Sequence, residues 1–413
     1  MTSVTIVGAG PAGLVAAETL AKRGVSVHVV DQDENPGEWK PCAGMLRDAA
    51  LRMFKVRPEL ACRQIRGIRV VLPNHQVDEV SYAHPIFWNF DRGTLARHLV
   101  ERVRKAGGSV DTGIRVVDVT RADEGARVSG YKLKLRASDG GIERVKAGML
   151  IAADGVNSII VKKTVVHPPF RPSQLGQCVQ YQILMDNQMI EKRIGDMNEF
   201  YYGGDVSPFG YAWIVPKDNS VTVGVGALLS KVNTSLKKFL DYVMTRHPVA
   251  SGKLAGGKIL RFEAALCPLS GLVSPTYGDG LVVVGDAAGH CSSISGEGMH
   301  YSMVAGEIAG RICSEAVEMG DISARFLGKY EGAWRRAIGS DMKWGRWLQN
   351  IALKRGFMSG AFAKDTRLRS RLSRKVADIL SGRRTYRESL IRAIPDFLIM
   401  KMAGAISTAK EDN

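Results

Sequence analysis

A single cysteine, Cys42, stands between a proline and a small-residue turn in the stretch WKPCAGM, residues 39–45. A thiol in such a place can be half of a disulfide, a metal ligand, a redox-active group or a small apolar side chain. The chain has six cysteines, which are scattered and form no C-x-x-C pair. That scatter argues against zinc and against a disulfide scaffold, and it suits a reducing cytoplasm. We therefore expect no metal, and the role of Cys42 depends on the rest of the chain.

A glycine-rich run near the start of the chain offers a second kind of chemistry, the binding of a dinucleotide. In SVTIVGAGPAGLVAAETLAKRGVSVHVVD, residues 3–31, the glycines Gly8, Gly10 and Gly13 have G-x-G-x-x-G spacing, and Asp31 follows 23 residues after the first of them. The apolar pattern around them predicts a strand over 4–7, a helix that Gly24 ends, and a second strand over 25–30. In that context the glycines permit a tight turn and close approach to a pyrophosphate. The helix N-terminus stabilises the anion, and Asp31 can accept hydrogen bonds from a ribose.

The glycine-rich run alone leaves FAD and NAD open, and two later segments favour FAD. MLIAADGVNSIIVK, residues 149–162, is a predicted strand followed by Asp154 and Gly155. Residues 278–310 contain a predicted strand, the pair Gly285-Asp286, and a glycine-rich loop that opens a helix with apolar residues at helical spacing. Together with the first run, these segments resemble the flavoprotein hydroxylase and reductase superfamily.

The resemblance implies an FAD site and a role for each matching position. Asp286 would hold the ribityl chain, and the backbone amides of Gly296 and Gly298 would lie near the flavin pyrimidine edge. There the N-terminus of the following helix stabilises the anionic reduced flavin. In NFDRGTLARHL, residues 89–99, Arg92 would reach the FAD; a plain surface arginine is the alternative. The full expected FAD set is Gly8, Gly10, Ala12, Gly13, Asp31, Cys42, Ala43, Gly44, Arg92, Asp154, Gly155, Asp286, Gly296, Gly298 and Met299.

These separated motifs set the expected architecture. We expect a mixed α/β and α+β protein with a Rossmann-like FAD-binding domain built from 1–70, 90–165 and 265–320. An antiparallel-sheet substrate domain would occupy 71–89 and 166–264, and a basic helical region would follow over 321–413. No second strand–G-x-G-x-x-G–helix unit appears, so a separate domain for NAD(P)H is not expected.

A further signature narrows the class of flavoenzyme. YAWIVPKDNSVTVGVG, residues 211–226, places Tyr211, Trp213 and Pro216 ahead of the pair Gly224 and Gly226. Together with KPCAGM, this pattern resembles the geranylgeranyl reductase family, archaeal digeranylgeranylglycerophospholipid reductases included. Tyr211, Trp213 and Val215 alternate along a strand, so they face one side of it. That face suits the lining of an apolar tunnel for an isoprenoid chain, although an ordinary sheet core has the same pattern.

The resemblance places Cys42 beside the flavin in the substrate cavity, with Tyr211 and Trp213 as its catalytic neighbours. The implied reaction is reduction of isolated trisubstituted C=C bonds. Such an alkene has no carbonyl to accept charge, so protonation must create a cation-like centre to which the flavin hydride adds. The Cys42 thiol would position the alkene carbon or supply its proton; a nearby hydroxyl or ordered water is the alternative donor, and a structural role for the cysteine also stays open.

The expected substrate is therefore a geranylgeranyl chain on a membrane (ether) lipid or lipid precursor, with reduced ferredoxin or NAD(P)H as electron donor. Three alternatives stay open: a flavin monooxygenase of the same superfamily, a reductase of a quinone or chlorophyll-precursor tail, and a flavin-bound interaction protein without turnover.

Charge is concentrated at the C-terminal end. The net charge is +16, and residues 325–413 hold 20 Lys and Arg against 8 Asp and Glu, so +12 of it lies there. KWGRWLQNIALKRGF, residues 343–357, has tryptophans at helical spacing among basic residues, a pattern typical of a helix at a lipid interface. A helical cap with a solvated basic face is the alternative. No nucleic-acid-binding motif accompanies the charge. With no signal peptide and no apolar run of membrane-spanning length, we expect a cytoplasmic protein, peripheral on the inner face of the membrane if the region docks there.

Overall fold

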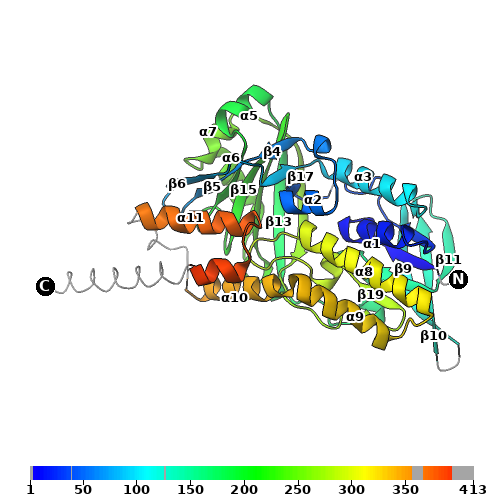
Figure 1. Ribbon diagram of the computed structural model, residues 1–413. Helices are drawn as coiled ribbons and strands as arrows, with labels where there is room; N and C mark the ends of the chain where they lie inside the picture. The colour runs from blue at the N-terminus through cyan, green and yellow to red at the C-terminus, as the bar shows by residue number, and fades with distance from the viewer. Residues whose placement is uncertain (1–2, 39, 125–126, 356–365, 393–413) are drawn as a thin grey trace.

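The first segment folds into the strand–turn–helix–strand unit that the sequence predicts. The computed structural model describes residues 3–38, 40–124, 127–355 and 366–392 (Figure 1). Strand β1 (Val4–Val7) leads through the glycine turn into helix α1 (Pro11–Ala21), and β2 (Val27–Val30) pairs parallel to β1. The second strand begins two residues later than predicted, because the Val25 amide still donates to Leu20 O in the turn that ends α1.

A six-stranded sheet forms the centre of the first body. Its order is β18-β19-β12-β1-β2-β8, and all neighbours are parallel except β18 and β19. The added strands are β8 (Ser109–Asp111), β12 (Met149–Ala152), β18 (Tyr277–Gly278) and β19 (Leu281–Val283). Ile6 packs toward α1 and α8, whereas the next residue, Val7, packs toward a second sheet on the other face. Because side chains alternate along β1, the central sheet packs against helices on one face and against the second sheet on the other.

Helices cover one face of this sheet, and a three-stranded antiparallel sheet covers the other. The helices are α1, α3 (Arg92–Lys105) and α8 (Met299–Met319). The small sheet is β9 (Ile114–Glu124), β10 (Arg127–Ala137) and β11 (Ile142–Ala147), with α4 (Ile159–Thr164) beside β9. Gly306 and Gly310 let α8 lie directly against the α1 backbone, because a Cβ on either would collide with it.

The second body is a seven-stranded sheet, drawn in the upper half of Figure 1. Its order is β17-β13-β16-β15-β14-β5-β6, antiparallel throughout except for the β14–β5 pair. The strands are β5 (Gly67–Val71), β6 (Val77–Ser81), β13 (Leu175–Leu184), β14 (Met197–Tyr201), β15 (Gly210–Pro216), β16 (Ser220–Leu228) and β17 (Lys258–Pro268). Helices α5 (Asn187–Arg193), α6 (Leu236–Thr245) and α7 (Ala250–Leu254) lie on one side of it.

Short elements connect the two bodies. A three-stranded antiparallel sheet has the order β3-β7-β4, with β3 (Met45–Arg47), β4 (Arg63–Ile65) and β7 (Phe87–Asn89). Helix α2 (Asp48–Met53) follows β3. Single turns of 3-10 helix are η1 (Pro58–Leu60), η2 (Pro172–Gln174), η3 (Leu229–Lys231) and η4 (Gly285–Ala288).

The described part of the C-terminal region is mostly helical, as predicted, and packs on the rest of the molecule. It comprises α9 (Ala324–Trp334), the π-helical segment η5 (Arg335–Gly339), α10 (Ser340–Arg355) and α11 (Thr366–Leu380). In Figure 1, α11 runs beside the β5–β6 edge of the large sheet. There Asp78 accepts hydrogen bonds from Arg369 Nε (2.9 Å) and Ser373 Oγ (2.7 Å), and Tyr82 donates to Asp378 (2.8 Å).

One basic residue of α10 does not have the lipid-facing place that the sequence suggested. Arg346 donates to the backbone oxygen of Leu269 (2.9 Å) and to the side chain of Gln349 (2.5 Å), and desolvation lowers its pKa. Its guanidinium therefore anchors α10 to the segment after β17. Trp347 is nearly half exposed, whereas the side chains of 352–355, Lys354 and Arg355 among them, lie outside the described residues. Among the described helices, none has the length and apolar content needed to cross a bilayer.

Candidate active site

One cavity of about 720 Å³ lies between the carboxyl ends of the parallel strands and one face of the seven-stranded sheet. It collects nearly all of the residues that the sequence singled out, although they come from six separated runs of the chain. They are Gly8, Gly10, Ala12, Asp31, Cys42, Ala43, Gly44, Arg92, Asp154, Gly155, Tyr211, Trp213, Asp286, Gly296, Gly298 and Met299. Of the predicted set, Gly13 is not part of the lining.

The three glycines of the first motif have different physical roles. Gly8 has φ +108°, and a Cβ there would overlap the Ala153 oxygen; a Cβ on Gly13 would overlap the Gly8 oxygen. These two glycines therefore allow β1, α1 and β12 to meet closely. Gly10 is different, because a Cβ on it meets no protein atom within 4 Å. The missing side chain leaves free space in the cavity beside the N-terminus of α1. No side chain caps this end of the helix.

Asp31 ends β2 with its carboxylate fixed toward the glycine turn. Oδ2 accepts from the Ala9 amide (2.6 Å) and Oδ1 from the Asp33 amide (2.8 Å). Burial raises the pKa of Asp31 against the effect of these two hydrogen bonds. Each oxygen keeps a lone pair that can accept from a ribose hydroxyl.

Asp154 has a local structural function that the sequence did not indicate. Its carboxylate accepts from Ser158 Oγ (2.6 Å) and from the Ile159 amide (2.8 Å), at the start of α4. Burial nevertheless raises its pKa. Gly155 beside it has φ +81° and nothing near its missing Cβ. Asp154 therefore shapes this edge of the cavity by fixing the turn.

Arg92 and Asp286 place opposite charges in the interior of the cavity. The Nε of Arg92 is buried and has no hydrogen-bond partner among the described residues, which excludes a plain surface arginine. Asp286 is half-buried at the wall of the cavity, and desolvation raises its pKa to about 7, while Arg92 opposes that rise. A buried donor without a partner and a desolvated carboxyl group indicate a polar ligand between them. The phosphates and hydroxyls of FAD fit these groups.

The glycine-rich loop before α8 is held by a residue that sequence reasoning missed. Gly296 has φ +66°, and Gly298 is the N-cap of α8 with no side-chain cap, so the first amides of the helix open on the cavity. The buried hydroxyl of Tyr386 contacts Ser292 Oγ (2.6 Å) and Ser295 Oγ (3.2 Å) in this loop. Tyr386 belongs to the C-terminal region, and no local sequence signal connects it to the loop.

The Cys42 loop is fixed from both sides. Gly44 has φ +81° and no room for a Cβ beside the Phe90 oxygen, whereas Ala43 needs no such conformation. The Gly44 amide donates to Cys42 Sγ (3.4 Å). From β13, Gln180 Nε2 donates to the Cys42 oxygen (3.4 Å) and to Glu263 (2.5 Å). Gln180 is thus a positioning residue for the loop, and it was not predicted.

The spacing of the Tyr211–Gly226 signature has a direct explanation in the sheet. Trp213 of β15 lies opposite Gly224 of β16, and Tyr211 lies opposite Gly226. A Cβ on Gly224 would overlap the Trp213 indole, and one on Gly226 would lie 3.3 Å from it. The two glycines therefore form a trough in which the indole lies across β16, next to the cavity. The Tyr211 hydroxyl donates to the Ser295 oxygen, which ties this strand to the loop before α8.

Three further cysteines line the same cavity: Cys178 on β13, Cys267 on β17 and Cys291 on the loop after η4. They are far apart in sequence, and strand register brings them together. Only the tertiary structure reveals this grouping.

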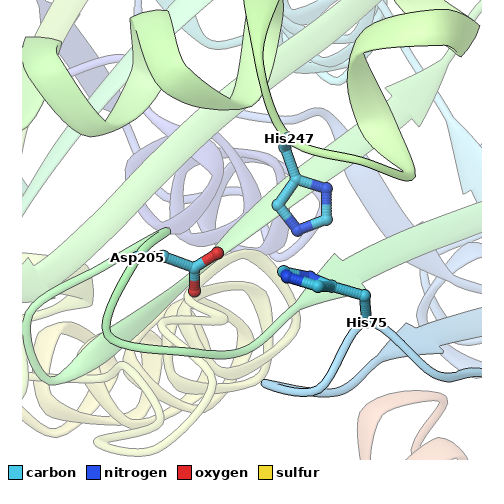
Figure 2. A group of neighbouring side chains, drawn as sticks. All are labelled: His75, Asp205 and His247. Carbon is cyan, nitrogen blue, oxygen red and sulfur yellow. The ribbon is translucent and has the colours of Figure 1, made fainter.

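A second group of potential ligands lies outside the cavity lining (Figure 2). His75, Asp205 and His247 place ligand atoms within 4.8 Å of one another. However, His247 Nδ1 accepts from the Val249 and Ala250 amides (3.2 Å each). The neutral ring then carries its proton on Nε2, so that nitrogen has no lone pair for a metal. We assign the group to packing between the β5–β6 hairpin and the α6–α7 turn.

Comparison with known proteins agrees with the geometry. The family model described as FAD binding domain matches residues 1–331. Digeranylgeranylglycerophospholipid reductase 2 of Methanothermobacter thermautotrophicus is 33% identical over 348 residues, 82% of this chain and 85% of that protein. Digeranylgeranylglycerophospholipid reductase of Methanocaldococcus jannaschii is 30% identical over 334 residues, 80% of this chain and 82% of that one.

A solved structure supports the fold. A geranylgeranyl bacteriochlorophyll reductase-like protein from Thermoplasma acidophilum superimposes with a TM-score of 0.77 at 24% identity, covering 84% of this chain and 86% of that one. The predicted fold class and FAD as cofactor are confirmed. The protein belongs to the digeranylgeranylglycerophospholipid reductase family of FAD-binding proteins.

Proposed function

We propose that this protein is an FAD-dependent reductase that saturates isolated C=C bonds in the geranylgeranyl chains of a digeranylgeranylglycerophospholipid. The relatives described above are named as reductases of this lipid. The observation that carries the proposal here is that one cavity joins the FAD motifs to an apolar sheet face with Tyr211 and Trp213 and to the Cys42 loop. Such a cavity lets a hydrocarbon chain lie next to the cofactor.

FAD, when bound, supplies the hydride that completes the saturation of each bond. The protein must exclude water, hold the alkene and provide a proton. The Trp213 indole and the aliphatic edge of Met299 give the cavity apolar surface. A chain of several double bonds requires that the hydrocarbon slide along this surface between turnovers.

Cys42 is the proposed proton source. The Tyr211 hydroxyl is a weaker candidate, because its proton is committed to the Ser295 oxygen and burial raises its pKa well above the usual value. Cys42 lines the cavity, and its sulfur accepts a hydrogen bond from the Gly44 amide, which stabilises the sulfur after its proton has left. Gln180 holds the backbone of Cys42, and the Gly44 amide holds its sulfur.

Electrons reach this site from reduced ferredoxin or NAD(P)H, and the lipid reaches it from a membrane that the protein contacts peripherally. To identify the donor, each candidate is added in turn to the oxidised protein under anaerobic conditions, and the rate of flavin reduction is measured. A donor that reduces the flavin within the time of one turnover is competent; one that is slower is not.

The reaction is tested by reducing the purified protein anaerobically and adding digeranylgeranylglycerophospholipid. We expect reoxidation of the flavin and a lipid whose mass rises by two hydrogens for each bond saturated. Quinone and chlorophyll-precursor substrates in parallel reactions test the alternative tails. Stoichiometric hydroxylation of the lipid with NADPH and oxygen would instead establish a monooxygenase.

Cys42→Ala should keep FAD and lose most alkene reduction, on the order of 100-fold, as expected for removal of an acid catalyst. Cys62→Ala is the matched control, because Cys62 lines a different hollow beside η1 and is not part of the active-site cavity. Equal rates in the two variants would return Cys42 to a structural role.

A further inference from the structure

The cavity reaches the C-terminal region at Leu380, the last residue of α11. Leu380 lines the cavity together with Phe87 and Trp213, and it packs against the apolar cluster that contains these two side chains. Tyr82 directly follows β6 and packs against the same cluster. Helix α11 lies beside β6 (Figure 1). The apolar wall of the cavity therefore continues to the contact between α11 and Tyr82.

Two arginines lie over the Tyr82 ring. The guanidinium carbon of Arg374, on α11, is 5.9 Å from the ring centroid, and that of Arg383, in the turn after α11, is 4.9 Å from it. Both arginines are exposed to solvent. The Tyr82 hydroxyl donates a hydrogen bond to Asp378 (2.8 Å), which holds the ring in place. The ring therefore gathers two cations at one point of the surface.

Among the described residues, no carboxylate balances these two charges. Asp378 is the one acidic residue of α11, and it pairs with a different arginine, Arg384 (3.2 Å). The guanidinium groups of Arg374 and Arg383 form no ion pair or hydrogen bond with any other residue that the structure describes. The surrounding charge is also positive, because residues 366–392 contain nine Lys and Arg against two Asp and Glu. Two guanidinium groups on one ring, without an acid beside them, suit an anion that both can bind.

The chain geometry keeps this pair close to the cavity. Arg383 is three residues after Leu380, so their Cα atoms are at most about 11 Å apart. Between them, Gly382 has φ +71°, and a Cβ on it would lie 2.7 Å from Nη1 of the buried Arg47. This close approach fixes the turn, so Arg383 stays at the end of α11 that lines the cavity.

We propose that Arg374 and Arg383 bind the phosphate of the phospholipid substrate, while its hydrocarbon chain enters the cavity beside Leu380. This inference rests on the proposed function, because it assigns a place to the headgroup of that lipid. A phosphate presents several anionic oxygens, so it accepts hydrogen bonds from two guanidinium groups at once. The Tyr82 ring orients the planar groups before the lipid arrives, which lowers the entropy cost of binding. The site therefore selects a phospholipid over an uncharged lipid with the same chains.

The test measures lipid binding to the oxidised FAD-loaded protein, without turnover. Digeranylgeranylglycerophospholipid and the uncharged digeranylgeranylglycerol are titrated separately by calorimetry, both in micelles of an uncharged detergent. The unmodified protein should bind the phospholipid at least about tenfold more tightly, because charge-assisted hydrogen bonds to phosphate are strong. Arg374→Gln combined with Arg383→Gln should remove most of that preference. Equal affinity of the unmodified protein for the two lipids would overturn the proposal.

Arg23→Gln combined with Arg325→Gln is the matched control. Both residues are exposed, and the change in net charge is the same. Arg23 follows α1 and Arg325 is in α9, and these two helices lie apart from α11 in Figure 1. The control should keep the preference for the phospholipid. Loss of the preference in both double variants would mean that overall charge attracts the lipid, and it would refute a specific site.

The outcomes separate this inference from the proposed reaction. A phospholipid that binds through Arg374 and Arg383 but is not reduced supports the site and refutes the reaction. A phospholipid that the unmodified protein and the double variant reduce with the same KM refutes the site and supports the reaction. If the double variant does not fold, Arg383→Gln alone must lower the preference, and an unchanged preference in that variant refutes the assignment.

Discussion

At the scale of single residues, the side chains that are missing determine the cofactor site as much as those that are present. Gly8 and Gly13 lack a Cβ because the backbone of a neighbouring element occupies the space, whereas Gly10 lacks one beside an open cavity. The same motif therefore contains positions required for folding and a position required for binding.

This difference predicts opposite results for substitutions two residues apart. Gly10 has φ −76° and free space, so Gly10→Val should fold normally and lose FAD, because the new side chain occupies the place of the pyrophosphate. Gly8→Ala should impair folding itself, because φ +108° and the Ala153 oxygen both oppose a Cβ. Flavin absorbance and circular dichroism of the two purified variants separate the outcomes. Full flavin content in Gly10→Val would contradict this placement of the motif.

The raised pKa of Asp286 predicts that the stability of the apoprotein depends on pH. Its pKa rises from 3.8 to about 7, chiefly through desolvation, so the folded chain holds a proton that the unfolded chain releases near pH 4. The contribution of this group to stability is therefore largest at low pH and falls as the pH rises toward 7.

Asp286→Asn removes that dependence. Between pH 5 and pH 8 the stability of the variant relative to the unmodified apoprotein should rise by about 2–3 kcal/mol, since one pKa unit corresponds to about 1.4 kcal/mol. Urea unfolding of both apoproteins at the two pH values measures this. A difference that is constant with pH would mean that Asp286 is ionised throughout.

At the scale of elements, β15 and β16 act as a pair that no single strand explains. Alternation places Tyr211 and Trp213 on one face of β15, but the indole lies flat only because β16 carries glycine opposite it. The helices behind the sheet hold both strands in place.

Gly224→Ala should displace the Trp213 ring and so alter the cavity. The overlap of the new Cβ with the indole should destabilise the protein by about 1–3 kcal/mol, and alkene reduction should fall while FAD stays bound. Gly252→Ala is the control: Gly252 is exposed in α7 with nothing near its missing Cβ, so the change should be neutral or slightly stabilising. Thermal unfolding of both variants gives the comparison, and equal melting temperatures would refute the trough.

At the scale of the whole molecule, the C-terminal region closes the cofactor site and also carries most of the excess positive charge. Tyr386 contacts the loop before α8, and Arg47 of β3 forms a buried ion pair with Glu297 in that loop. The Arg47 guanidinium also donates a hydrogen bond to the backbone oxygen of Ile379 in α11. The described part of the region is thus packed on the rest of the molecule, and its outer surface is what it can offer to a membrane.

The outer surface still predicts salt-sensitive binding to anionic liposomes. Lys343, Arg374 and Arg387 are exposed, and each cation near an anionic surface contributes about 1 kcal/mol. Reversing all three to glutamate should weaken sedimentation with anionic liposomes without loss of FAD, and neutral liposomes should bind little of either protein. Arg346→Glu is not a substitute, because it should destabilise the α10 anchor. If the protein does not sediment with anionic liposomes at low salt, the region is a helical cap and does not bind membranes.

The sequence by itself determined the parallel unit around β1, the FAD motifs and the signature on β15 and β16, because each depends on residues close together in the chain. Short-range spacing fixes a glycine turn, a helix start and an alternating face. It also identified Cys42, Arg92 and Asp286 as cavity residues, through their position beside such motifs.

Only the tertiary structure decided which distant residues complete the site. Gln180 reaches the Cys42 loop, Cys178 meets Cys267, and Tyr386 holds the loop before α8, through strand register and helix docking. From its place among tryptophans and other basic residues, Arg346 was expected to face lipid. Its guanidinium instead donates a hydrogen bond to the backbone oxygen of Leu269. The local sequence pattern shows which interactions a side chain is able to make. The packing of distant segments against one another decides which of these interactions form.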